Sequence, residues 1–90
     1  MAQYFAADYA GGSFALLGPP HLAALVAVLV ATRRDAGITQ NELAERLGRS
    51  QSFVAKIEAG ERRMDVVEFV AWVRSLKADP EATFRRFVHW

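Results

Sequence analysis

A run of polar side chains at helical spacing between residues 51 and 56 is the part of this sequence best suited to recognition chemistry. Gln51, Ser52 and Lys56 fall on one face of a predicted short helix, whereas Val54 and Ile57 fall on the opposite face. Amide, hydroxyl and ammonium groups can pair with the base edges that DNA exposes in its major groove. The polar face therefore predicts a helix that reads base pairs, although a helical hairpin with a solvated outer face would show the same spacing.

Each of these polar residues carries a group suited to a particular contact. Gln51 is the best candidate for reading a base, because its amide can bond with both N6 and N7 of adenine. Ser52 is short and suits either base of a pair, and Lys56 suits guanine or a phosphate. Arg49 and Ser50 lie just before the predicted helix, so we expect them at the DNA backbone, with a base as a second possibility for Arg49.

Two short helices joined by a tight turn position this polar face, over residues 39–60. Thr39 can cap the first helix and form a capping box with Glu42. Gly48 ends that helix, because glycine enters the left-handed conformation without a steric penalty. Ser50 can also cap the second helix. We expect the apolar residues of both helices to pack together: Leu43, Ala44, Leu47, Val54 and Ile57.

This segment resembles the Cro/C1-type (XRE) helix-turn-helix family. The resemblance covers residues 22–78 and rests on many positions that agree in order and without gaps. It implies an all-α, five-helix λ-repressor-like DNA-binding domain, which we place at residues 19–90, and residues 1–18, which lie outside the resemblance, form an N-terminal arm before it. The matching residues are Thr39-Gln40, Leu43-Ala44-Glu45, Leu47-Gly48, Gln51-Ser52, Val54, Lys56-Ile57-Glu58 and Gly60-Glu61-Arg62-Arg63.

The same resemblance implies roles for residues outside the reading face. Gln40, at the start of the first hairpin helix, would contact a phosphate, and Arg62 and Arg63 would do so from the loop after the second helix. Glu58 would pair with Arg33, near the end of the preceding helix, because an unpaired acid beside DNA would repel phosphate. We therefore expect a structural ion pair at this position and no direct contact of either residue with a base.

Composition limits the other classes of function. Ninety residues allow one small domain, and a hydrophobic fraction of 52% leaves apolar surface for a partner. Cysteine is absent, and His21 and His89 are far apart without acidic neighbours, so we expect no metal and no cofactor. No nucleophile, base and orienting group occur together, which argues against an enzyme. The net charge is +1, but residues 33–63 hold seven Lys or Arg against five acids, where phosphate contacts would be made.

Two further helices are expected to build the core around the hairpin. Residues 20–35 are apolar nearly all round, which predicts a helix buried on more than one side. The run of apolar residues at 22–31 is too short to cross a membrane, so we expect a cytoplasmic protein of a bacterium or phage, associated with the nucleoid.

Asp65 starts the next helix, and Trp72 lies off its apolar stripe, at an edge or an interface. The stripe consists of Val66, Phe69, Val70, Val73 and Leu76.

The last helix, residues 79–90, has an aromatic stripe made of Phe84, Phe87, Val88 and Trp90. This stripe would be either a lid on the core or, as we favour, a dimer contact, since interface cores are rich in aromatic residues. A homodimer would hold two recognition helices about 34 Å apart and bind an inverted repeat in double-stranded DNA. We therefore expect a sequence-specific transcriptional regulator, with heterodimerisation with a related regulator as a further possibility. A protein-interaction module with the same fold is the alternative.

Residues 1–18 lie before the first expected helix and include four aromatic residues, Tyr4, Phe5, Tyr9 and Phe14. Disordered tails are poor in aromatic residues, which favours an arm that packs on its own core or on a second subunit. A loose tail is the other reading, because chain termini are often poorly ordered.

Overall fold

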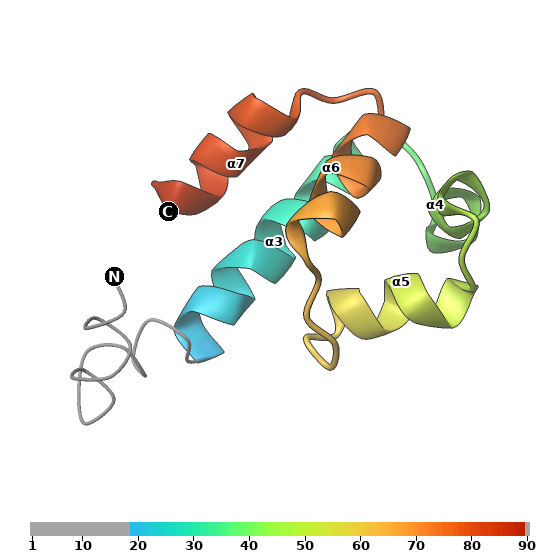
Figure 1. Cartoon of the computed structure of the whole chain (residues 1–90), viewed down its shortest axis with the longest axis horizontal. Helices are drawn as coiled ribbons and strands as arrows, with labels where there is room; N and C mark the ends of the chain where they lie inside the picture. The colour runs from blue at the N-terminus through green and yellow to red at the C-terminus, as the bar shows by residue number, and fades with distance from the viewer. Residues whose placement is uncertain (1–18, 90) are drawn as a thin grey trace.

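Five α-helices and no strands make up residues 19–89, which are the residues that the computed structural model describes. The helices are α3 (Pro19–Asp35), α4 (Gln40–Leu47), α5 (Gln51–Glu58), α6 (Val66–Ser75) and α7 (Pro80–Val88). Figure 1 shows α3 and α6 in the middle, the α4–α5 hairpin at one end and α7 at the other. The expected all-α class with five helices is confirmed, and α3 begins one residue earlier than predicted.

Local hydrogen bonds define the hairpin as the sequence predicts. The Thr39 hydroxyl accepts from the Glu42 N–H at 3.1 Å, and the Glu42 carboxylate accepts from the Thr39 N–H at 2.9 Å, which completes the capping box. The Thr39 backbone N–H holds the pKa of Glu42 below its ordinary value. Gly48 has a φ of 66°, and Ser50 accepts from the Phe53 N–H at 3.2 Å. These caps fix where α4 ends and where α5 begins.

One hydrophobic core joins the hairpin to the other helices. In the hairpin, α4 packs against α6 and α5 packs against α3, while α7 packs against α3 and α6 from the other side (Figure 1). The predicted core positions Leu43, Ala44, Val54 and Ile57 are all buried. The largest fully buried side chains are Trp72, Leu29, Leu43, Ile57, Val54 and Val73. The core therefore fixes α5 from behind and leaves its polar face outward.

Two predictions about α6 are wrong. Val66, expected in the core, has 76% of its surface exposed, because it is the first residue of the helix and does not pack against the core cluster. Trp72, expected at an edge or interface, is fully buried, because α6 is covered by α4 on one side and α7 on another. The buried arc of α6 is therefore wider than one stripe. Among the described residues the Trp72 indole N–H has no hydrogen-bond partner, at a cost of about 1–3 kcal/mol.

Both ends of the expected domain reach beyond the structure as described. The predicted arm at residues 1–18 and the predicted interface residue Trp90 lie outside the described residues. Within them, α7 begins after the cap Asp79, with Pro80 in its first turn, as predicted. No helix of residues 19–89 is long and apolar enough to cross a membrane.

Candidate nucleic-acid interface

Helix α5 presents the predicted reading face to solvent. Gln51, Ser52 and Lys56 are exposed, whereas Val54 and Ile57 on the other side are 0% and 1% exposed. The Ser50 cap orients the first turn of α5, and its hydroxyl remains at the surface. A helix whose inner face is held in this way keeps its outer side chains in a fixed register, which is what the reading of base edges requires.

The predicted ion pair between Arg33 and Glu58 is present and nearly buried. The Arg33 Nε donates to Glu58 Oε2 at 2.6 Å and the Arg33 Nη2 donates to Glu58 Oε1 at 3.0 Å. The two side chains are 10% and 7% exposed. Hydrogen bonding to Glu58 raises the pKa of Arg33 above its ordinary value. The Arg33 Nη1 also donates to the Ile38 carbonyl at 2.8 Å, so one guanidinium joins α3, the loop before α4 and the end of α5.

A chain of hydrogen bonds runs from this ion pair to the reading face. The Gln40 Nε2 donates to Glu58 Oε1 at 2.9 Å, and the Gln40 Oε1 accepts from Gln51 Nε2 at 2.8 Å. Gln40, expected at a phosphate, is therefore also the residue that orients Gln51. Buried charge at one end of the chain of bonds thus restricts the amide at the other end, which faces solvent.

The bond from Gln51 to Gln40 leaves the groups that adenine needs. A primary amide has two N–H donors and one carbonyl oxygen. Gln51 donates one N–H to Gln40, so its second N–H and its Oε1 remain available for a base. Adenine presents one acceptor, N7, and one donor, the N6 amino group, in the major groove. The remaining N–H and oxygen of Gln51 match that pair, one for one.

A second cluster, centred on Glu68, holds two of the predicted backbone ligands. The Arg62 Nη1 and Nη2 each lie 3.1 Å from a Glu68 oxygen, and the Arg49 Nη2 lies 3.7 Å from Glu68 Oε2. Arg62 hydrogen bonds lower the pKa of Glu68, and Glu68 raises the pKa of Arg62. Both guanidinium groups lie over the Phe53 ring, 4.6 and 4.7 Å from its centroid.

This Glu68 cluster positions two cations beside α5. Arg49 and Arg62 keep 50% and 40% of their side-chain surface exposed, so each retains N–H groups that can reach an approaching phosphate. Arg63 follows in the same loop and is exposed. The cluster therefore gathers cations from the turn before α5 and from the loop after it.

Sequence reasoning missed two features of this surface. The contact between Gln40 and Gln51 joins residues of different helices, and no local pattern indicates it. Glu68 forms a capping box with Asp65 at the start of α6, and it also binds the two arginines, which its place in the sequence does not indicate. The sequence signal for this cluster is the excess of Lys and Arg over acids at residues 33–63, because a nearby carboxylate offsets the repulsion between clustered cations.

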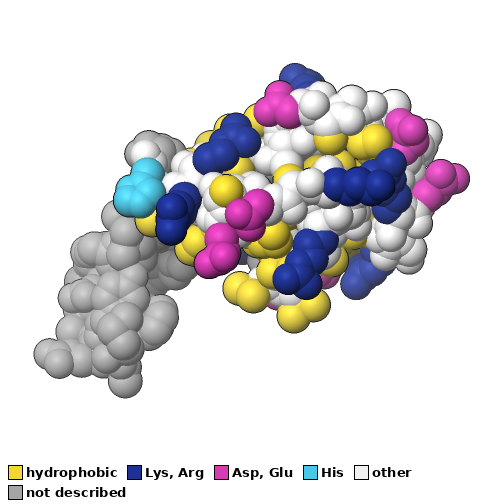
Figure 2. Space-filling view, turned by 90° about the horizontal axis from the view of Figure 1, so that it is seen from above, with side chains coloured by type: hydrophobic (Ala, Val, Ile, Leu, Met, Phe, Trp, Pro, Cys, Tyr) yellow, Lys and Arg dark blue, Asp and Glu magenta, His cyan; other side chains and the backbone are white. Residues whose placement is uncertain are grey.

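The surface around α7 is different in character. In the view of Figure 2, acidic and basic side chains alternate and apolar atoms reach the surface between them. On α7, Phe84 and Val88 are each 49% exposed, and Phe87 is half-buried. Phe84 contacts Phe69 edge to face, with ring centroids 5.9 Å apart. This end of the molecule thus presents apolar side chains, whereas the hairpin end presents amides and cations.

Comparisons with known proteins agree with this arrangement. A family model described as a helix-turn-helix domain matches residues 24–86. An XRE-family like protein from Pseudomonas syringae pv. tomato str. DC3000 is 47% identical, over 78% of this chain and 85% of that chain, with a TM-score of 0.73. The clp gene regulator ClgR from Corynebacterium glutamicum is 25% identical, over 79% of this chain and 76% of that chain, with a TM-score of 0.71.

A third solved structure shares the fold at lower identity. The restriction-modification controller protein C.Esp1396I is 18% identical, over 80% of this chain and 95% of that chain, with a TM-score of 0.73. At this identity the likeness concerns the fold alone. No match is found among curated proteins.

Proposed function

Because this chain belongs to the XRE-type family of helix-turn-helix DNA-binding proteins, we propose that it regulates transcription by reading an inverted-repeat operator as a homodimer. The observation that carries the proposal is the chain of hydrogen bonds from the Arg33–Glu58 pair through Gln40 to Gln51. It places an amide with matched donor and acceptor groups at the start of α5, on the exposed face. Helix α5 lies in the major groove, with Gln51 on adenine and Ser52 and Lys56 on neighbouring bases.

Backbone contacts come from both ends of α5. Arg49 and Ser50 lie before the helix and Arg62 and Arg63 lie after it, so the two groups can meet phosphates on either side of the groove. Gln40 lies at the start of α4, where its backbone can also approach a phosphate. In this arrangement the cations set the register of the protein on DNA, and the three side chains on α5 select the sequence.

The homodimer gives two recognition helices for one operator. Helix α5 has eight residues and offers few base contacts by itself. The exposed Phe84 and Val88 on α7, together with Phe87 and Trp90, are the proposed contact between two copies. Two α5 helices about 34 Å apart would meet half-sites one turn of DNA apart. A similar solved structure is a gene regulator by its name, which supports a regulatory role.

The apolar surface on α7 also favours a second candidate, a protein-interaction module that docks on a partner through this end. The partner could be a related regulator, in a heterodimer, or a protein without DNA-binding activity. The two candidates differ in what the hairpin does: only the regulator needs the cations around α5 at the DNA backbone.

Salt dependence separates these roles. Replacing Arg63 with alanine should weaken DNA binding on all sequences and reduce the slope of log K against log salt by about one unit per subunit, because one phosphate contact is lost. The matched control is Arg85→Ala, which removes the same charge from an exposed position on α7. The measurement is a fluorescence-anisotropy titration of duplex DNA over a series of salt concentrations.

The control variant decides whether the change is local. Arg85→Ala should keep the slope of the unsubstituted protein, because its charge lies at the end of the molecule away from α5 (Figure 1). If Arg63→Ala and the unsubstituted protein show the same slope of log K against log salt, Arg63 does not contact the DNA backbone. No binding of duplex DNA by the unsubstituted protein at low salt would favour the interaction module.

A further inference from the structure

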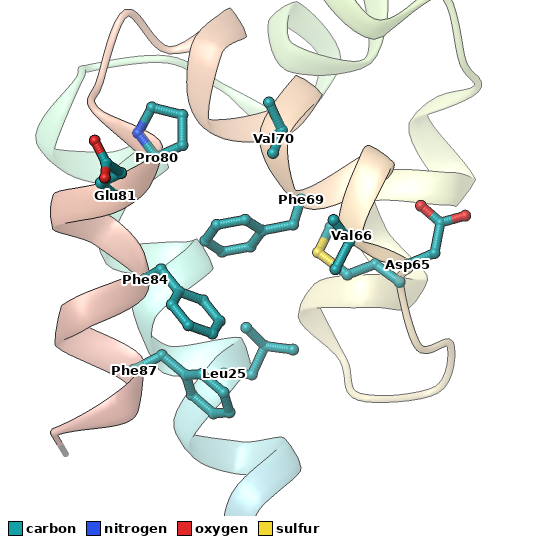
Figure 3. A pocket seen from close by; sticks show the side chains of 10 residues that line it. Leu25, Asp65, Val66, Phe69, Val70, Pro80, Glu81, Phe84 and Phe87 are labelled. Atoms are coloured by element: carbon teal, nitrogen blue, oxygen red, sulfur yellow. The ribbon is translucent and has the colours of Figure 1, made fainter.

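An apolar groove of about 400 Å³ lies between α3, α6 and α7, on the side of the molecule away from the DNA-reading face. Figure 3 shows Phe69, Phe84 and Leu25 converging on it, with Val66 at its edge and Phe87 at one end. Its walls are almost wholly hydrocarbon, and only the carboxylates of Asp65 and Glu81 lie at its rim. A hollow of this size and character is energetically costly when it faces water, because apolar surface favours burial by about 25 cal/mol per Å².

We propose that residues 1–18 of the same chain occupy this groove. This inference does not rest on the DNA-binding proposal, but it limits the α7 surface that remains for the proposed dimer contact. The segment has the composition of an element that buries itself: twelve of its eighteen residues are hydrophobic and one, Asp8, is charged. Such a composition differs from that of solvated tails, which are rich in charge and poor in aromatic residues.

The point of attachment also favours this segment. Residues 1–18 join the described structure at Pro19, the first residue of α3. Leu25, which lines the groove, lies six residues further along this helix, at a distance of about 9 Å given the helical rise. Leu25 and Phe87 lie at the end of the groove nearest the N-terminal part of α3 (Figure 3). Extended chain spans up to about 3.3–3.6 Å per residue, so the chain is long enough to bring Phe14 to this end of the groove and Tyr9 to the far wall.

Tethering gives the segment an advantage over a separate molecule. A segment attached by a short linker acts at an effective concentration in the millimolar range. A second copy could present its own groove in a two-fold contact, because such contacts place the same patch on both subunits. Two hollows that face each other remain unfilled, so a second copy that packs on α7 leaves the groove itself empty.

Occupation of the groove would also affect the α7 surface. Phe84 and Phe87 line the groove and are also among the proposed dimer contacts. A docked segment therefore covers part of α7 and leaves Val88 as the more accessible apolar side chain of that helix. Residues 1–18 thus compete with a second copy for the same two phenylalanines.

Tyrosine is a specific reporter for this inference, because the two tyrosines of the chain, Tyr4 and Tyr9, both lie in residues 1–18. In the full chain labelled at tyrosine rings and at leucine and valine methyl groups, we expect nuclear Overhauser effects from tyrosine to Leu25, Val66 or Val70. Contacts within one molecule should survive dilution and should be absent from a mixture of singly labelled chains.

Val66 and Val67 provide a matched pair of variants. Both are 76% exposed and both lie in the first turn of α6, but only Val66 lines this groove. Val66→Asp should abolish the tyrosine-to-methyl effects at Leu25 and Val70, because it places a charge in the apolar contact. Val67→Asp should leave them unchanged. A carboxylate in the first turn of a helix is tolerated, and the fluorescence of the buried Trp72 reports whether each variant is folded.

Three results would overturn the inference. Absence of tyrosine-to-methyl effects in the unsubstituted chain would show that residues 1–18 do not occupy the groove. Effects that persist in the mixture of singly labelled chains would assign the groove to the segment of a second copy. Equal effects in Val66→Asp and Val67→Asp would place the segment elsewhere on the surface. DNA binding is not part of the readout, so each of these results leaves the proposed function untouched.

Discussion

Replacing Glu58 with methionine is expected to destabilise the domain by about 3–5 kcal/mol, because it leaves the Arg33 charge nearly buried without its partner. Glu58 accepts two hydrogen bonds from Arg33 and one from Gln40, and methionine replaces none of them. Small domains have unfolding free energies of about 5–15 kcal/mol, so this loss is a large part of the total. Thermal unfolding should show Tm lower by roughly 12 °C or more.

The matched control is Glu61→Gln, which removes an acid from an exposed position three residues further along the chain. It should change the unfolding free energy by less than about 0.5 kcal/mol. The double variant Arg33→Met with Glu58→Met should recover most of the lost stability, since an apolar pair can replace a buried ion pair with little net cost. Denaturant unfolding of all four proteins measures these differences. A Glu58→Met variant as stable as the Glu61→Gln control would contradict the structural role of the pair.

The second large effect concerns recognition of the operator. Gln51→Ala should weaken binding to the operator by about 1–3 kcal/mol for each half-site, which is roughly 5- to 150-fold, while the fold is unchanged. The reason is that Gln51 offers one N–H and one carbonyl oxygen beyond its bond to Gln40, the pair that adenine requires. Val54 and Ile57 still hold α5 on the core, so the helix itself is not affected.

Non-specific DNA is the internal control for this prediction. Contacts to bases contribute to specific binding, whereas contacts to phosphates contribute to both specific and non-specific binding. Gln51→Ala should therefore lower the ratio of operator affinity to non-specific affinity, and Arg63→Ala should lower both affinities together. If competition titration shows the same ratio of operator to non-specific affinity for Gln51→Ala as for the unsubstituted protein, Gln51 does not read a base.

Residues close in sequence account for the part of the fold that could be predicted. Thr39 and Glu42 are three residues apart, and Gly48 follows an apolar stripe directly, so the limits of α4 follow from local chemistry. The apolar stripe of α6 indicates one buried side of the helix, but it does not indicate how many other helices pack against α6. For that reason the stripe wrongly predicts Val66 in the core and Trp72 at an edge or interface.

The candidate site was predictable to a smaller extent. The polar face of α5 follows from helical spacing, and the pair of Arg33 with Glu58 follows from the family resemblance. The bond from Gln51 to Gln40 and the pairing of Glu68 with Arg49 depend on how the helices cross, and crossing angles are set by the whole core. These two links, from Gln51 to Gln40 and from Glu68 to Arg49, are therefore visible in the structure alone.

Selection of binding sites from a random library of duplex DNA by the intact chain tests the central proposal most directly. The proposed homodimer predicts enriched sequences that contain an inverted repeat, with half-site centres about 10–10.5 base pairs apart or a multiple of that spacing. An adenine in each half-site should lose its enrichment when the selection is repeated with Gln51→Ala. Enriched sequences without a repeat would contradict the homodimer on an operator, and failure to enrich any sequence would contradict sequence-specific reading by α5.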